Sequence, residues 1–233
     1  MKFFHLALII IFSIGLSTAS FAQITGGAKA GINFNSFRAN NKYDVVPGFN
    51  VGGFAKMQIT DFLKVRGELL YNQQGANLID YSVIIPDLYH SNAKIRFHSV
   101  QIPVLAELGI PSLNADAIQP KLLLGGFYSY AVSTRASFVN VAWVSGYNPV
   151  EYVGGTGMNS YFQRSQYGIV GGIAGEIVLF SKPVSLEFRY QYNLNNVNKP
   201  GVQSVYSLKN TFDEWGDNLY LSTLSFNVSV TLF

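Results

Sequence analysis

Nine charged side chains lie on the polar positions of segments in which apolar and polar residues alternate, and they carry most of the chemistry that this sequence offers. Lys29, for example, lies between two alanines, and Phe188 lies between Glu187 and Arg189. Five of the nine are basic and four are acidic. Because an isolated buried charge is costly, this near balance favours mutual pairing in a closed space, and we interpret the set as a structural charge network. The nine residues are Lys29, Lys56, Arg66, Glu68, Glu107, Lys121, Glu176, Glu187 and Arg189.

Catalytic chemistry has one candidate pair, His98 and Ser99, since a histidine and a serine could serve a lipid-modifying acyl hydrolase. A working dyad needs the two side chains within hydrogen-bonding reach of each other. Neighbouring residues of a strand point to opposite faces, so we expect these two to stay apart. The chain has no cysteine, and it shows no phosphate-binding glycine loop, HExxH or calcium-loop pattern. We therefore predict no enzyme, no cofactor and no metal site, with the acyl hydrolase kept as an alternative.

The elements that would position these residues are strands, because apolar side chains recur at every second position. Leu186, Phe188, Tyr190 and Tyr192 alternate with polar residues, for example, and a period of two is typical of strands. With their flanks the segments are about 12 to 16 residues long, whereas globular strands average about 5–6 and a tilted membrane-crossing strand needs about 9–11. The facing of the fifth segment is ambiguous. The alternating segments are 28–35, 49–59, 63–72, 100–108, 121–132, 167–179, 186–193 and 224–232.

The links between these segments alternate in length, which indicates a membrane-spanning barrel. Transmembrane barrels have short periplasmic turns and long external loops, and aromatic side chains gather on their outer faces at the headgroup level. The short links are 60–61 and 181–183, the link 110–119 is of moderate length, and the long links are 38–46, 76–93, 136–165 and 195–217. The aromatic residues near strand ends are Tyr71, Phe97, Tyr128, Tyr130, Tyr167, Tyr190, Tyr192 and Tyr220.

We predict an all-β fold: a transmembrane, antiparallel, up-and-down β-barrel of eight strands with both termini in the periplasm. Eight strands leave an interior only wide enough for side chains, so the nine charges would fill a non-conducting lumen. An alternative architecture has ten strands, with an additional hairpin from 137–144. An alternative function is a narrow passive channel. The final Phe233 is in phase with polar residues, so either it sits in a bulge or turns at the membrane edge, or the assembly signal is weak.

Residues 1–22 have the order of a cleaved signal peptide, which leaves 23–233 as the barrel domain. Lys2 supplies a positive charge, an apolar run follows at 3–16, and Ser20 and Ala22 are the small residues of a cleavage site. The run is short for a helical span, which needs about 20 residues. Export and the barrel pattern together place the protein in the bacterial outer membrane. The formal charge of +3 comes without a basic patch that would indicate nucleic acid.

The long links offer candidate contacts for a partner, because binding residues concentrate on loops above a rigid scaffold. These candidates are aromatic: Trp143, Tyr147 and Tyr152 lie in the third long link and Trp215 lies in the fourth. The same residues are equally suited to extending the strands above the membrane or to lying on lipid headgroups.

The mature chain resembles the porin-like, PorT-type outer-membrane β-barrel family common in Bacteroidetes. The resemblance rests on AGINFNSF after the signal, ELLYNQQG (68–75), VQIPVLAELG (100–109), KLLLGG (121–126), LEFRYQYNL (186–194) and Phe233. It implies insertion by the barrel-assembly machinery, with periplasmic chaperones and outer-membrane lipid as further partners. Some relatives take part in gliding motility or protein secretion, and there is no family catalytic residue to carry over. We expect a non-enzymatic structural or interaction protein of the envelope, whose external loops contact an envelope partner.

Overall fold

The computed structural model describes residues 24–38, 43–82, 89–109, 118–142, 150–157, 159, 162–198 and 219–233. The expected signal peptide, 1–22, lies outside these residues, as do Trp143, Tyr147 and Trp215. Within the described ranges, no helix is long and apolar enough to cross a membrane.

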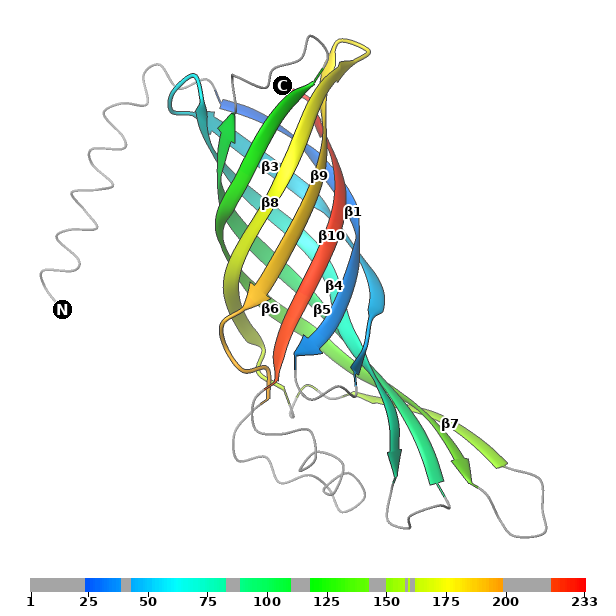
Figure 1. Cartoon of the computed structure of the whole chain (residues 1–233). Helices are drawn as coiled ribbons and strands as arrows, with labels where there is room; N and C mark the ends of the chain where they lie inside the picture. Colours follow the sequence, from blue (N-terminus) through cyan, green and yellow to red (C-terminus); the bar gives the residue numbers. More distant parts are fainter. Residues whose placement is uncertain are drawn as a thin grey trace, which may run out of the picture.

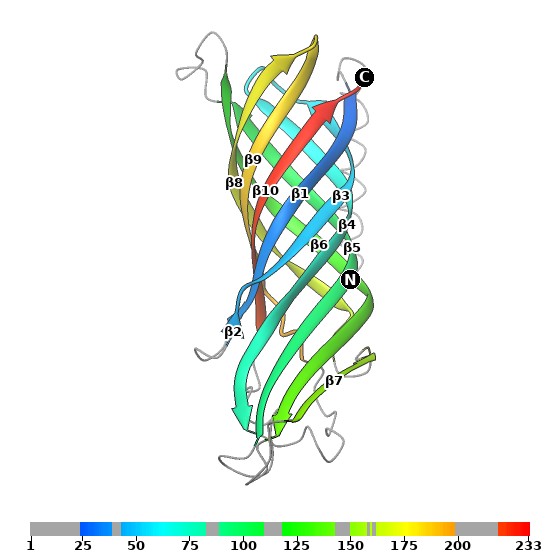
Figure 2. The same ribbon diagram turned by 90° about the vertical axis from the view of Figure 1, so that its right-hand side faces the viewer.

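Eight long antiparallel strands close into a barrel, which confirms the predicted fold (Figure 1). Each strand pairs with its neighbour along the barrel, β4 pairs with β5, and β10 returns to pair with β1 from Gly27↔Thr231 to Arg38↔Tyr220. Figure 2 shows β10 lying beside β1 where the barrel closes. The strands are β1 (Ile24–Arg38), β3 (Val46–Gln58), β4 (Leu63–Ser82), β5 (Tyr89–Gly109), β6 (Gln119–Ala142), β8 (Ser165–Leu179), β9 (Lys182–Asn193) and β10 (Tyr220–Thr231).

The alternation of the sequence becomes the two faces of the barrel wall. Apolar side chains such as Ile32, Val104 and Ile173 are exposed on the outer face, and polar side chains of the same strands are buried in the lumen. The facing of the fifth segment, which is part of β6, is resolved by the structure. Leu123 and Phe127 face inward, whereas Leu124 faces outward. An outer surface of exposed aliphatic and aromatic side chains matches the hydrocarbon of a bilayer.

The segment proposed for an additional hairpin does form one, but outside the barrel wall. The distal part of β6 pairs with β7 (Val150–Gly157) from Arg135↔Gly157 to Ala142↔Val150. Among the described strands β7 pairs with β6 alone, and β8 takes the place beside β6 in the wall. The short β2 (Tyr43–Asp44) pairs only with the distal end of β4. The barrel itself therefore has eight strands, not ten.

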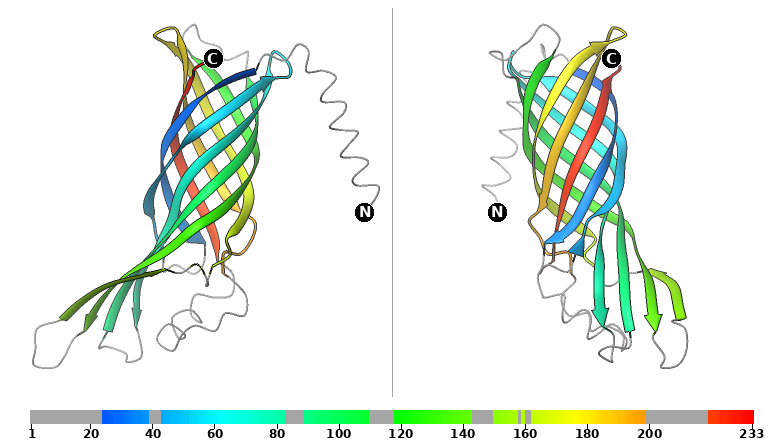
Figure 3. Two further views of the ribbon diagram at one scale, coloured as in Figure 1. Left: turned by 180° about the vertical axis from the view of Figure 1, so that it is seen from behind. Right: turned by 45° about the vertical axis from the view of Figure 1, so that its right-hand side comes forward.

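Two of the long links are largely strand, which corrects the expectation of loops at 76–93 and 136–165. β4 and β5 continue to pair as far as Ser82↔His90, and β5 pairs with β6 as far as Tyr89↔Ala142. The apolar alternation is lost in these stretches, but the backbone ladder continues across register shifts between Leu78 and Tyr81 and between His98 and Ser99. The ends of β4, β5 and β6 leave the barrel with β7 as a projecting sheet (Figure 3).

The opposite end of the barrel has short turns and both ends of the described chain. The β8–β9 hairpin turns through Phe180 and Ser181, whose φ values of 50° and 62° are those of a two-residue turn with left-handed backbone. The C-terminus bends at the edge: the backbone N–H groups of Leu232 and Phe233 both donate to the carbonyl of Gly26, at 2.8 and 3.3 Å. Since two consecutive residues donate to one carbonyl, Phe233 leaves the strand register at the rim, in agreement with the predicted bulge or turn.

The predicted aromatic residues on the outer face include Tyr128, Tyr130, Tyr167 and Tyr190, all exposed. The assignment of Phe97 to this face is wrong, because its side chain is fully buried inside the barrel. Phe97 shares the inward phase of β5, and its aromatic character alone suggested the outer face.

Candidate functional site

The lumen is the candidate site, because seven of the eight barrel strands direct the nine predicted charged residues into it. Lys29 comes from β1, Lys56 from β3 and Lys121 from β6, for example. Eight of the nine are buried, and the ninth, Glu176, has a side chain that is 15% exposed. They occupy the half of the barrel that ends in the short turns.

Two carboxylates at the centre of this group are each surrounded by the same three cations. Lys29 Nζ lies 3.3 Å from Glu68 and 3.0 Å from Glu187. Arg66 lies 2.9 Å from Glu68 and 2.8 Å from Glu187. Arg189 lies 2.8 Å from Glu68 and 2.6 Å from Glu187. Such close pairing compensates charges that would be costly to bury singly.

A second group of charges lies nearer the short turns. Lys56 Nζ lies 3.8 Å from Glu107 and 3.7 Å from Glu176. Lys121 Nζ donates to Glu176 at 2.6 Å and lies 4.0 Å from Glu107. Because Arg66 Nη1 is also 2.8 Å from Glu107, the two groups join and all nine charges form one network.

Side-chain amides fill the next level of the lumen, above the central carboxylates. The amide nitrogen of Asn50 donates to Asn33 and Asn227, at 2.8 Å in both cases. Asn72 donates to Gln101 at 2.6 Å, and Gln101 donates to Gln191 at 2.9 Å. The sequence interpretation did not single these residues out, although all except Asn227 are in phase with a charged residue of their own strand.

An apolar cluster closes the end of the lumen next to the projecting sheet. Phe97 packs edge-on against Phe37 and Phe162, with ring centroids 6.1 and 5.1 Å apart. The segment before β8 joins the segment after β9, since the Gln163 N–H donates to the Val197 carbonyl at 2.8 Å. Val197 in turn donates to Leu219 at 2.8 Å. The side chains of Phe37, Phe97, Phe162, Val197 and Leu219 are essentially inaccessible to solvent.

A second apolar group packs against the inner wall formed by β5, β6 and β8. It consists of Leu105, Phe127 and Val170, all buried. On β3, the ring of Phe54 lies under two cations of the network, with Lys56 Nζ 4.8 Å and the Arg66 guanidinium 5.7 Å from its centroid. Charged, amide and apolar side chains therefore occupy the lumen at every level, and the arrangement suits a solid core rather than a water path.

The model of a known family, described as the outer membrane protein beta-barrel domain, matches residues 3–199. The chain belongs to this family. No curated protein matches the chain.

Solved outer-membrane barrels resemble this family member in fold. Ail, the attachment invasion locus protein of Yersinia pestis, is 12% identical with a TM-score of 0.38, covering 89% of this chain and 98% of that one. Neisserial surface protein A is 14% identical with a TM-score of 0.43, covering 90% and 99%. CarO of Acinetobacter baumannii is 12% identical with a TM-score of 0.42, covering 87% and 97%.

In this outer membrane beta-barrel, His98 and Ser99 lie on opposite faces of β5. The His98 Nδ1 is hydrogen-bonded to the Tyr71 hydroxyl on the outer face, at 2.6 Å. The Ser99 hydroxyl donates to the backbone carbonyl of Asn72 inside the barrel, at 3.1 Å. The two side chains are therefore separated by the barrel wall and do not form a dyad.

The loop candidates are only partly visible in the described residues of this family member. Tyr152 belongs to β7, where its backbone pairs with Asn140 of β6. Trp143, Tyr147 and Trp215 lie outside the described residues. Within the described ranges, no group of acidic residues or histidines is arranged to hold a metal ion.

Proposed function

We propose that this outer-membrane barrel is a non-enzymatic envelope protein whose filled lumen conducts no ions and whose projecting sheet contacts a partner. The observation that carries the proposal is the continuous filling of the lumen. A charge network, an amide layer and an apolar closure succeed each other along the axis. A passing ion would have to displace several of these contacts together, and each displaced charge would remain buried without its partner.

The projecting sheet supports an interaction role, because its strands are longer than a membrane crossing requires. β6 has 24 residues, whereas β9 and β10 have 12 each. A crossing needs about 9–11 residues, so about half of β6 is available beyond the bilayer. A sheet held there by a rigid barrel suits recognition, since strand edges and faces can pair with another chain.

The proposal includes the orientation of the barrel in the membrane and the route by which the chain reaches it. The sheet end faces the exterior, since long extensions are typical of the external side and short turns of the periplasmic side. A signal peptide at 1–22, chaperones and the barrel-assembly machinery would bring the chain to the membrane. The narrower resemblance to PorT-type proteins, with secretion or motility among their roles, remains a prediction.

Planar-bilayer recording of the purified protein tests the closed lumen. We expect no discrete current steps from the wild-type protein at any applied voltage. The control is the R66A/R189A variant, in which two large side chains are removed from the centre of the network. Reproducible single-channel steps from the wild-type protein would favour the narrow channel instead.

The interaction role is tested separately, by photo-crosslinking in intact cells. A crosslinking residue at Ser137, exposed on the projecting sheet, should yield a discrete protein adduct. The same residue at Val104, exposed on the lipid-facing wall, should yield none. Equal protein adducts at both positions would contradict a partner-binding role for the sheet.

A further inference from the structure

A cluster of basic side chains lies on the outer face of the wall, where the projecting sheet leaves the barrel. Arg96 of β5 and Arg135 of β6 are directly opposite each other in the ladder. Arg135 is exposed and Arg96 is half-buried. Lys94 and His98 occupy the same face of β5, two residues to either side of Arg96. The four residues Lys94, Arg96, His98 and Arg135 are called the rim basic group below.

The arginine pair has no side chain on either flank. Gly75 of β4 is paired with Arg96, and Gly157 of β7 is paired with Arg135, so the row reads Gly75–Arg96–Arg135–Gly157. Gly75 is buried, with the Ile95 backbone against its Cβ position, whereas Gly157 is exposed, so the row is open to a ligand on the Gly157 side. Nothing surrounds the Cβ position of Gly157 within 4 Å.

Like charges placed directly opposite in an antiparallel ladder destabilise it. Among the described residues, no carboxylate forms an ion pair with either arginine of the row. Asp44 lies two strands from Lys94, in the row Asp44–Asn77–Lys94. Glu151 of β7 is six residues beyond Gly157, about 20 Å along the strand. Within the described part of the chain the pair thus has no anionic partner, and a negatively charged ligand would offset its repulsion.

The surroundings of the rim basic group indicate where that anion comes from. Along the outer face of β5 the side chains change from the exposed Val104, Ile102 and Val100 to the half-buried His98 and Arg96. Tyr130, directly opposite Val100, is also exposed. The face is thus apolar at the depth of the hydrocarbon, aromatic at its boundary and basic above it, which matches the polarity of a lipid molecule along its length.

We propose that Arg96 and Arg135 bind the phosphate of a phosphorylated lipid in the external leaflet. A planar guanidinium donates two parallel hydrogen bonds to phosphate oxygens, which a lysine ammonium cannot do. Lys94 and His98 flank the phosphate, and the acyl chains lie along Val100, Ile102 and Val104. This inference rests on the proposed external orientation of the sheet end and is independent of whether the lumen conducts.

The test measures lipid binding to the intact protein by native mass spectrometry, with the protein in a mild non-ionic detergent. The probes are bisphosphorylated lipid A and the same lipid A with both phosphates removed, which keeps the acyl chains identical. We expect the wild-type protein to bind the phosphorylated form at least about tenfold more tightly, as two charge-assisted hydrogen bonds predict. The R96Q/R135Q variant should lose this preference, and R96K/R135K should retain only part of it.

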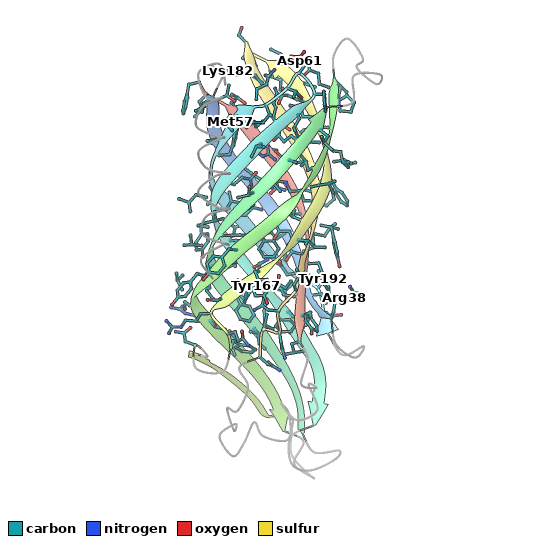
Figure 4. All side chains as sticks on the ribbon, turned by 90° about the vertical axis from the view of Figure 1, so that its left-hand side faces the viewer. Arg38, Met57, Asp61, Tyr167, Lys182 and Tyr192 are labelled. Carbon is teal, nitrogen blue, oxygen red and sulfur yellow. The ribbon has the colours of Figure 1, made fainter. Side chains whose placement is uncertain are left out.

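The matched control is R38Q, which removes an arginine at the same end of the barrel but outside the rim basic group. Arg38 lies over the ring of Tyr192, 5.3 Å from its centroid, on another part of the wall (Figure 4). Heat-modifiable gel mobility verifies that every variant is folded. The proposal is overturned if R96Q/R135Q keeps the wild-type preference, or if R38Q loses as much of it. Full competition by inorganic phosphate at millimolar concentration would also overturn it, because the site would then take a free anion and not a lipid.

Discussion

The Arg66 guanidinium and the Glu107 carboxylate lie 2.8 Å apart, and this contact joins two groups of buried charges into one network. Arg66 also contacts both central carboxylates, Glu68 and Glu187. Arg66 therefore links the filling of the centre of the lumen to the filling of the part next to the short turns.

Substitution of Arg66 by glutamine should be strongly destabilising, because it leaves three carboxylates with one cation fewer in a space closed to water. We expect a loss of about 3–5 kcal/mol in the free energy of unfolding, as for other broken buried ion pairs. Urea-induced unfolding in lipid vesicles, followed by tryptophan fluorescence, measures it. Lys182→Gln is the control: Lys182 lies at the short-turn end (Figure 4) and donates to the Leu232 carbonyl at an exposed position. Equal stability of both variants would refute a structural role for the network.

Glu68 and Arg189 should show strong coupling in a double-mutant cycle. Arg189 Nη1 and Nη2 donate to the two oxygens of Glu68 at 2.9 and 2.8 Å, a bidentate geometry. E68Q leaves the buried Arg189 without Glu68, and R189Q leaves the buried Glu68 without Arg189. In the double variant both charges are absent. We expect a coupling energy of about 1–3 kcal/mol, measured from the same unfolding curves. R189K should not restore stability, since lysine cannot form both bonds. Additive effects would show that the pair makes no specific contribution.

Phe97→Ala should lower the free energy of unfolding, because the Phe97 ring fills space inside the barrel. Its ring is buried between Phe37 and Phe162, and truncation leaves a cavity that typically costs about 3–5 kcal/mol. Phe49→Ala is the control, since Phe49 is 45% exposed on the outer face and lipid chains can fill the vacated space. A larger loss from Phe49→Ala than from Phe97→Ala, measured by unfolding in vesicles, would contradict the inward assignment of Phe97.

The fold could be predicted from the sequence wherever one face of a strand meets lipid. There the alternation has a physical cause, and Leu186, Phe188 and Tyr190 were sufficient to place β9. Towards the distal ends of β4, β5 and β6 the alternation is lost from the sequence. The projecting parts of β4, β5 and β6 therefore could not be distinguished from loops. The inward position of Phe97 follows from the phase of its strand and not from its residue type.

The charged residues of the candidate site could also be identified from phase, but their partners could not. Arg66 and Glu187 are 121 residues apart in the chain, and Lys29 and Glu187 are 158 apart. Which residues meet across the lumen depends on the stagger and tilt of eight strands, which local patterns do not determine. The amides of Asn50 and Gln101 were overlooked because a neutral polar residue inside a barrel gives the same signal as one on a solvent-exposed strand.

The claim that the lumen is filled can be tested most directly by thiol accessibility, because the chain has no cysteine of its own. Ser129 and Ser225 face the lumen and are 0% and 1% exposed, whereas Ser165 is exposed at the external rim. Single variants S129C, S225C and S165C would be treated in vesicles with a small, charged, membrane-impermeant thiol reagent and analysed by mass spectrometry. We predict rapid modification of S165C, and modification of S129C and S225C only after unfolding. Modification of all three at similar rates in the folded protein would contradict a filled lumen.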